Sequence, residues 1–236
     1  MNIALSCNDL TVRYGKAAAV SGVSLEFEAG VVHAVVGPNG AGKSSLLNAL
    51  IGAVPSTGRV EVNGRDVSRT STAERARLGL ASVGQGRPIF PHLTVTENFE
   101  VAASILRLGG DVVEAALDRF PVLRERRRTP VGALSGGEQQ MVMVARALMA
   151  DCSVLLLDEA GTGLAPWVIQ MILDLVEELR AAGTTTIISE PTVGRMVAAA
   201  SHGVVMVRGS IVGRASGHDE LSDAYTQALG LRPVGT

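Results

Sequence analysis

The stretch GPNGAGKSS, from Gly37 to Ser45, decides the fold because it fits the phosphate-loop pattern G-x-x-x-x-G-K-[ST]. It follows an apolar run at 31–36 and precedes a helical pattern at 43–52. Glycines let backbone N–H groups turn toward phosphate oxygens, and the N-terminus of the following helix adds its positive dipole. The strand, loop and helix together predict a nucleotide site formed by Gly37, Pro38, Asn39, Gly40, Ala41, Gly42, Lys43, Ser44 and Ser45.

Two side chains of this loop carry most of the chemistry. Lys43 places a positive charge at the β- and γ-phosphates, and the Ser44 hydroxyl is suited to bind Mg²⁺. The apolar run SVLLLDE at 153–159 supplies the matching carboxylates. Asp158 is expected to hold Mg²⁺, directly or through water, and Glu159 to act as the general base toward the attacking water. The pattern therefore predicts a nucleoside triphosphatase.

Short apolar segments alternate with longer helical patterns along the chain, which is typical of a layered α/β fold with a mostly parallel core sheet. The segments 5–14 and 23–30 read as an antiparallel pair of strands, and Asn63-Gly64 marks a further hairpin. Residues 86 to 135 show only helical signals, among them a capping box at 94–97. We expect one domain over 1–236, with a helical insert at about 86–150.

Composition narrows the class of protein. The 236 residues are 47% hydrophobic and 19% charged, which suits a compact fold. A net charge of -2 with 3% aromatic residues gives no basic field for nucleic acid, so no nucleic-acid partner is expected. The two cysteines, Cys7 and Cys152, lack metal-ligand spacing, and no apolar run reaches the roughly 18 to 20 residues of a membrane span. The four histidines and the RERRR run at 124–128 are expected to be structural or solvated.

A second anion-binding helix end is predicted at LSGGEQQM, from 134 to 141. Ser135 and Glu138 form a capping-box pair around Gly136 and Gly137. Since one nucleotide needs only one phosphate loop, this helix end is expected to serve a nucleotide held by another subunit.

Together these motifs resemble the ATP-binding subunits of ABC transporters, over about residues 5 to 230. GPNGAGKSS matches the Walker A loop, VLLLDE the Walker B strand and LSGGEQQM the signature. The resemblance places Gln85 in the Q-loop, where it couples the metal and γ-phosphate to a transmembrane subunit, and Tyr14 on the adenine ring. It implies ATP and Mg²⁺ as cofactors, permease subunits as partners, and a location on the cytoplasmic face of the membrane. It also implies a head-to-tail dimer, with a second copy or a related ATPase.

A narrower resemblance rests on QGRPIFPHLTVTEN at 85–98, GEQQM and GLAP. These are similar to the paired ATPases of branched-chain amino acid importers. Ile89, Phe90 and Leu93 would then contact a permease helix, although burial within the helical insert explains them equally well. The expected function is to energise import of branched-chain or other small amino acids. The alternative is a regulatory or degenerate subunit with little hydrolysis of its own, and an ABC protein acting on DNA or ribosomes is disfavoured.

The chain departs from the family pattern at three places near the expected site. Pro191 stands at the switch position, where relatives carry a histidine or glutamine, and proline offers neither a polar side chain nor an N–H. Ala160 and Gly161 replace the usual Pro-Ser of the D-loop, which suggests a more flexible loop, and Gly84 replaces the proline before the Q-loop glutamine. We therefore expect intact binding of ATP and reduced hydrolysis. Thr192 would restore a polar contact if the loop shifts by one residue.

Overall fold

The fold is built on a six-stranded sheet with the order β10-β9-β3-β8-β7-β6 in a computed structural model that describes residues 2–84 and 89–231. All neighbouring strands pair in parallel except β9 and β10, which form an antiparallel hairpin near the end of the chain. The expected mostly parallel core sheet is therefore confirmed. Its strands are β3 (Val32–Val36), β6 (Leu80–Val83), β7 (Val154–Asp158), β8 (Thr185–Glu190), β9 (His202–Val207) and β10 (Ser210–Ser216).

A second sheet of four antiparallel strands has the order β2-β1-β4-β5. The predicted Asn63-Gly64 hairpin joins β4 to β5, and both turn residues have positive φ, 49° and 75°. Two consecutive positive φ angles are what the favoured two-residue hairpin turn requires. The strands are β1 (Ile3–Tyr14), β2 (Ala17–Glu28), β4 (Thr57–Val62) and β5 (Arg65–Asp66).

The predicted helical insert contains α3, α4, α5 and the 3₁₀ turn η1, and leads into α6. The capping box is present, since the Thr94 hydroxyl accepts the Glu97 N–H and the Glu97 carboxylate accepts the Thr94 N–H at 2.7 Å. The helices are α1 (Lys43–Leu50), α2 (Thr72–Arg77), α3 (Val95–Leu106), α4 (Val112–Arg119), α5 (Pro121–Glu125), η1 (Val131–Ala133), α6 (Gly136–Ala147), α7 (Pro166–Ala181), η2 (Arg195–Val197) and α8 (His218–Ala228).

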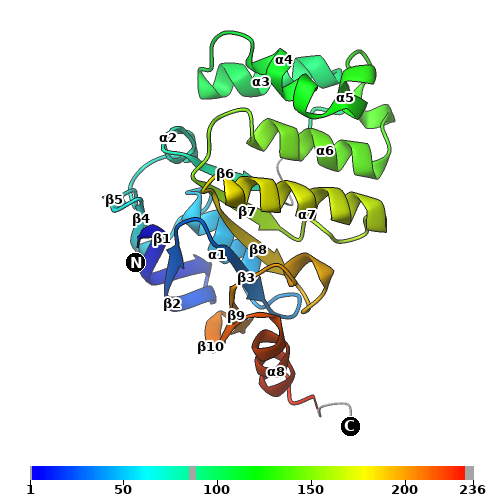
Figure 1. Cartoon of the computed structure of the whole chain (residues 1–236). Helices are drawn as coiled ribbons and strands as arrows, with labels where there is room; N and C mark the ends of the chain where they lie inside the picture. Colours follow the sequence, from blue (N-terminus) through cyan, green and yellow to red (C-terminus); the bar gives the residue numbers. More distant parts are fainter. Residues whose placement is uncertain (1, 85–88, 232–236) are drawn as a thin grey trace.

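Alternating side chains of the central sheet enter two separate cores. Val35, Leu156 and Ile187 pack with α1 and the antiparallel sheet, whereas their neighbours Leu155 and Ile188 pack with the helices on the other face. This alternation follows from the period of two along a strand. Figure 1 shows the resulting layers, with α6 and α7 next to the sheet and α3, α4 and α5 outside them. The phosphate loop comes directly after β3 and before α1. It therefore lies at the edge of the sheet where the parallel strands have their carboxyl ends.

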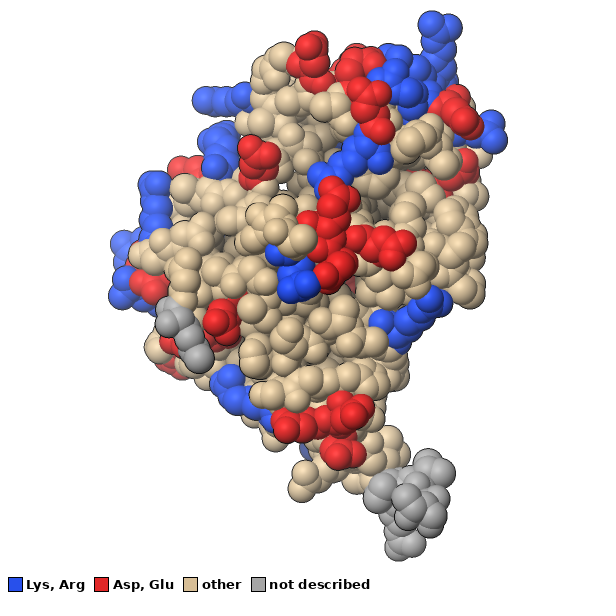
Figure 2. Space-filling view, in the orientation of Figure 1, with Lys and Arg blue, Asp and Glu red and all other residues tan. Residues whose placement is uncertain are grey.

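Charged residues of both signs alternate over the face seen in Figure 2. The RERRR run has acidic partners of its own, because Arg124 lies 3.0 Å from Glu114 and 2.6 Å from Asp118, and Arg127 lies 2.6 Å from Glu114. These partly exposed ion pairs agree with a solvated helix end. Among the described residues, no helix is both long enough and apolar enough to span a bilayer.

Candidate nucleotide-binding site

The phosphate loop is held against two strands so closely that two of its glycines have no room for a side chain. A Cβ atom at Gly37 would lie 2.0 Å from the Met206 carbonyl oxygen in β9. At Gly42, where φ is 105°, it would lie 2.2 Å from the carbonyl oxygen of Ala19 in β2. Glycine is therefore required here by close packing as well as by the phosphate.

The loop borders a cavity of about 490 Å³, and Lys43 and Glu159 meet at its wall. Lys43 is only 3% exposed, and its Nζ donates to the Gly37 carbonyl oxygen at 2.8 Å and lies 3.5 Å from Glu159 Oε1. The structure thereby brings together the predicted phosphate-binding cation and the predicted general base. The cavity is lined by Ala19, Asn39, Gly40, Gly42, Lys43, Ser44, Ser45 and Glu159.

Other residues predicted for this site lie beside the cavity. Tyr14 is 54% exposed, and its hydroxyl oxygen accepts a 3.5 Å hydrogen bond from the Ser45 hydroxyl, which places an exposed aromatic ring at the cavity edge. Ala41 has a buried side chain, and its N–H donates to the Pro38 carbonyl oxygen at 3.0 Å. Ala19 was not predicted, because only its strand pairing brings it to the loop.

Asp158 lies at the end of β7 and is only 6% exposed. Burial raises the pKa of its carboxyl group, and hydrogen bonding with the Ser44 hydroxyl offsets part of that effect. Among the described residues, its Oδ1 atom has no hydrogen-bond partner. A buried carboxylate oxygen without a partner, beside a serine hydroxyl, fits a hard cation such as Mg²⁺. Gln85, the third predicted metal ligand, lies outside the described residues.

Packing explains why glycine stands at position 84, where the family pattern has a proline. A Cβ atom at Gly84 would lie 2.9 Å from the Cβ atom of Asp158, so a larger residue there requires a shift of the end of β7. Glycine at 84 therefore leaves the position of Asp158 undisturbed.

Glu159 has an unusual backbone, with a positive φ of 50°. The cost of this left-handed conformation is offset locally, since the Glu159 N–H donates to the Ser189 carbonyl oxygen of β8 at 2.9 Å. This backbone directs the side chain toward Lys43 and the cavity. The end of β8 thus helps to set the orientation of the predicted general base.

The residues that follow Ser189 include residue 191, which is the switch position. Pro191 presents no polar side chain, and its carbonyl oxygen accepts a 2.9 Å hydrogen bond from the Tyr225 hydroxyl of α8. Thr192 is exposed. Glu190 is 7% exposed, and its Oε1 accepts the Gly161 N–H at 3.2 Å. Burial is the main reason why the pKa of Glu190 is raised to about 7, with the nearby Glu159 adding to it.

The raised pKa of Glu190 predicts a loss of stability with rising pH. Its ordinary pKa is 4.5, so between pH 4.5 and about 7 the unfolded chain releases this proton while the folded chain keeps it. The contribution of Glu190 to the free energy of unfolding therefore falls over that window, by about 3 kcal/mol at roughly 1.4 kcal/mol per pH unit. Glu190→Gln removes the titration. Urea unfolding should show the variant gaining on wild type from pH 5 to pH 8, and a constant difference would contradict the prediction.

The sequence alone suggests that Gly161 makes the D-loop more flexible. The structure instead gives a packing reason for the glycine at this position. A Cβ atom at Gly161 would lie 2.4 Å from Cγ of Met196, a buried residue of η2. We predict that Gly161→Ser lowers the free energy of unfolding by about 1 to 3 kcal/mol, the usual cost of overpacking. Met196→Ala in the same chain should recover part of that loss in a double-mutant cycle. Additive effects of the two changes would show that the residues do not compete for space.

The signature motif has the predicted local structure. Ser135 caps α6, its hydroxyl accepts the Glu138 N–H, and Glu138 Oε2 accepts the Ser135 N–H at 2.8 Å. Gly136 is exposed with open space around it, whereas a Cβ at Gly137 would meet the side chain of Val168 at 2.8 Å. The residues that line the phosphate cavity include none of these four. Figure 1 accordingly shows α6 in the helical part of the molecule, apart from α1.

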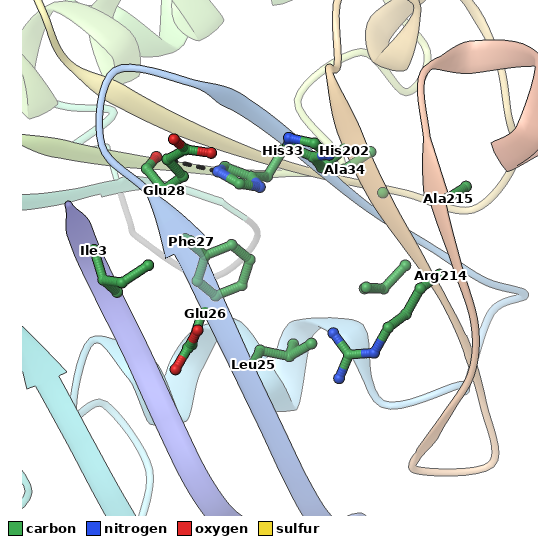
Figure 3. A pocket seen from close by; sticks show the side chains of 12 residues that line it. Ile3, Leu25, Glu26, Phe27, Glu28, His33, Ala34, His202, Arg214 and Ala215 are labelled. Atoms are coloured by element: carbon green, nitrogen blue, oxygen red, sulfur yellow. Dashed lines mark hydrogen bonds between the residues drawn. The ribbon is translucent and has the colours of Figure 1, made fainter. Parts of the chain in front are cut away.

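A second hollow, of about 210 Å³, shares no lining residue with the phosphate cavity. Figure 3 shows His33 and His202 together at one side of it, with Arg214 across the opening. His33 is buried, its Nε2 lies 3.2 Å from the Glu28 carbonyl oxygen, and burial lowers its pKa. Its contacts are those of a packed structural histidine. Within 2–84 and 89–231, no group of three or more His, Cys, Asp or Glu is arranged to hold a metal.

Comparison with known proteins decides the family. The model of the ABC transporter family matches residues 20–162, more than half of the chain. The chain belongs to the ABC transporter ATP-binding family. It is 35% identical over 229 residues to the high-affinity branched-chain amino acid transport ATP-binding protein of Pseudomonas aeruginosa, covering 94% of this chain and 98% of that protein. A probable branched-chain amino acid transport ATP-binding protein of Archaeoglobus fulgidus is 36% identical, covering 80% and 82%.

Solved ABC cassettes share the fold. The crystal structure of a cassette in its ADP conformation has a TM-score of 0.82 and 29% identity, and covers 94% of each chain. A nucleotide-free cassette has a TM-score of 0.84 and 28% identity, and covers 95% of each. The predicted fold class and ATP-hydrolase activity are thereby confirmed, and the alternative of a subunit with little hydrolysis of its own is not favoured.

Proposed function

We propose that this ABC ATPase binds and hydrolyses ATP to energise an importer of branched-chain or other small amino acids. The observation that carries the hydrolytic role is the 3.5 Å approach of Lys43 to Glu159 at the wall of the phosphate cavity. The substrate class is supported by the 35% identity with the Pseudomonas aeruginosa relative, which extends over nearly the full length of both proteins. We further propose that 1–236 form one domain, because both cores share the central sheet.

The chemistry follows from the positions of the side chains. The glycine-rich loop offers backbone N–H groups to the phosphates, and Lys43 exchanges its contact with Glu159 for the negative charge of ATP. Glu159 then accepts a proton from the attacking water. The hydroxyl of Ser44 and the carboxylate of Asp158 are the described groups that would hold Mg²⁺, and Gln85 is proposed to join them. Bound Mg²⁺ supplies charge neutralisation at the transferring phosphate.

The arrangement of the signature supports a head-to-tail dimer, because Ser135, Gly136, Gly137 and Glu138 lie outside the cavity of their own chain. In this proposal they cap the ATP held by a second copy or a related ATPase, while Tyr14 stacks on adenine in its own chain. Gly136 is exposed and its Cβ position is open, as close approach to a phosphate requires.

A permease is proposed to dock on a mostly apolar hollow of about 420 Å³ between the insert and the core, at the cytoplasmic face of the membrane. Phe90 lines it, and the Arg146 guanidinium lies 5.4 Å from the centre of the Phe90 ring. Ile105 on its rim is 55% exposed. Ile89 packs against the core cluster that includes helices of the insert, which supports burial as the explanation for this residue. Leu93 lies in the turn that follows Phe90, where its carbonyl oxygen accepts the Val131 N–H at 2.9 Å.

The proline at the switch position predicts a submaximal hydrolytic rate that one substitution should raise. Pro191→His restores a polar side chain and keeps the carbonyl group that Tyr225 contacts. Because one transition-state contact is worth about 10² to 10³ in rate, we expect kcat to rise by about tenfold or more with little change in KM. Steady-state Mg²⁺-ATPase assays measure this, with Thr192→His as the neighbouring control. An unchanged or lower kcat for Pro191→His would mean that the catalytic geometry does not admit a switch contact.

Transport itself is tested by uptake of labelled leucine in cells that lack this gene. We expect wild type to restore uptake and Glu159→Gln to fail, while both accumulate equally and bind ATP. Labelled thiamine is a useful second solute, because a thiamine import ATP-binding protein of Brucella abortus is 38% identical over 77% of this chain. Restored thiamine uptake without leucine uptake would contradict the proposed substrate class and leave the ATPase role intact.

A further inference from the structure

The last two residues of β8 accept hydrogen bonds from three backbone N–H groups in two segments of the proposed catalytic site. The Ser189 carbonyl oxygen accepts the N–H of Glu159, and the Glu190 carbonyl oxygen accepts the N–H of Gly37 in the phosphate loop at 3.3 Å. The Glu190 side chain reaches further and accepts the Gly161 N–H, two residues beyond Glu159. One strand end therefore holds the phosphate loop, the general base and the loop that follows it.

This strand end is also fixed from the opposite side. The Tyr225 hydroxyl of α8 donates to the carbonyl oxygen of Pro191 at 2.9 Å. Such a bond needs only the backbone of residue 191, so it is unaffected by the missing polar side chain. The segment 189–191 is thus held by main-chain and side-chain hydrogen bonds. These bonds do not involve the side chain of residue 191.

Placing the carboxyl group of Glu190 at this position costs desolvation free energy. It is 7% exposed, and Asp158 and Glu159 add negative charge nearby. An apolar residue would satisfy packing without the desolvation cost of a carboxyl group. Within the part of the chain that the structure describes, its side chain accepts a hydrogen bond from the Gly161 N–H, which gives the carboxyl group a positioning role.

We propose that Glu190 is a positioning residue for ATP hydrolysis, which holds the loop after Glu159 through the Gly161 N–H while Tyr225 fixes the strand end from α8. The inference rests on the proposed catalytic role of Glu159. Glu190 acts through the loop and does not touch the reacting atoms. It supplies a fixed geometry at a strand end where the switch contact is absent.

The test compares Glu190→Ala with Glu190→Gln in the full-length chain. Alanine removes the acceptor, whereas glutamine keeps a carbonyl oxygen for the Gly161 N–H at nearly the same size. We expect Glu190→Ala to lower kcat by about ten- to a hundredfold with KM for ATP changed less than about threefold, and Glu190→Gln to stay within about threefold of wild type. Tyr225→Phe should lower kcat by about three- to tenfold. Glu177→Ala, at an exposed position of α7, is the matched control.

Hydrogen exchange at the Gly161 amide gives a readout that does not depend on turnover. Protection should be similar in wild type and Glu190→Gln and should fall in Glu190→Ala. Unchanged kcat and unchanged protection in Glu190→Ala would overturn the positioning role. If Glu190→Gln lost as much activity as alanine, the charge and not the acceptor would matter, which also overturns it. By contrast, a wild type without any turnover that Glu159→Gln removes would contradict the proposed site itself.

Discussion

Glu159→Gln should lower ATP turnover by about 10² to 10⁴-fold, the usual contribution of a positioned general base. Glutamine has nearly the shape of glutamate but cannot take a proton from water. Binding of ATP should persist, because the phosphate loop is unchanged and Lys43 no longer has Glu159 Oε1 as an ion-pair partner at 3.5 Å. The measurement is the single-turnover rate at saturating ATP and Mg²⁺, together with the Kd of a fluorescent ATP analogue.

The split between rate and affinity identifies the role of the residue. Loss of both turnover and affinity would place Glu159 in phosphate or metal binding and not in proton transfer. Glu177→Gln, which removes an exposed carboxylate on α7, controls for a general effect of negative charge and should leave both quantities unchanged. Turnover that survives Glu159→Gln would require another base, and the buried carboxyl group of Glu190 would be the first candidate.

The features that sequence predicts are those carried by short, local patterns. GPNGAGKSS specifies its own loop through the glycines, and the apolar runs before it and before Asp158 specify buried parallel strands. The capping boxes at Thr94 and Ser135 are likewise local, and both are present. Each of these elements follows from the spacing of a few residues, so no knowledge of the distant chain is needed.

The features that sequence does not predict depend on contacts between distant segments. The helix α8 has one buried residue, Leu221, and its N-cap residue, Gly217, provides no side-chain cap, so its pattern is weak. The bond between Tyr225 and the Pro191 carbonyl oxygen joins residues 34 apart, and it becomes visible only when β8 and α8 are placed.

Gly84 and Gly161 are two further residues whose role depends on contacts between distant segments. Gly161 faces Met196, and Gly84, just after β6, faces Asp158 at the end of the neighbouring strand β7. In the sequence alone, both glycines depart from the family pattern and suggest weakened function. In the folded chain each one is the residue that its neighbours leave room for. A departure from a motif therefore has to be judged against the packing around it before it is taken as functional decay.

Lys43→Met should weaken ATP binding by at least about thirtyfold. Methionine is close to the length of the lysine stem and keeps the buried packing, but it removes the charge that faces the phosphates. Truncating one partner of a buried charge pair costs about 2 to 5 kcal/mol, and each 1.4 kcal/mol is tenfold in affinity. Isothermal titration with ATP and Mg²⁺ measures the change. Lys16, which is exposed and the only other lysine of the chain, gives the control Lys16→Met, expected within about threefold of wild type.

The same substitution separates binding from folding, because Lys43 also contacts protein groups. Its Nζ donates to the Gly37 carbonyl oxygen, and its charge offsets that of Glu159. Lys43→Met should therefore lower the free energy of unfolding without nucleotide, whereas Lys43→Met combined with Glu159→Gln should recover part of it, since the side chain at 159 then carries no charge for Lys43 to offset. Affinity should stay low in the double variant. If affinity returned with stability, the lysine would serve to neutralise Glu159, and the phosphate contacts would come from the backbone of the loop alone.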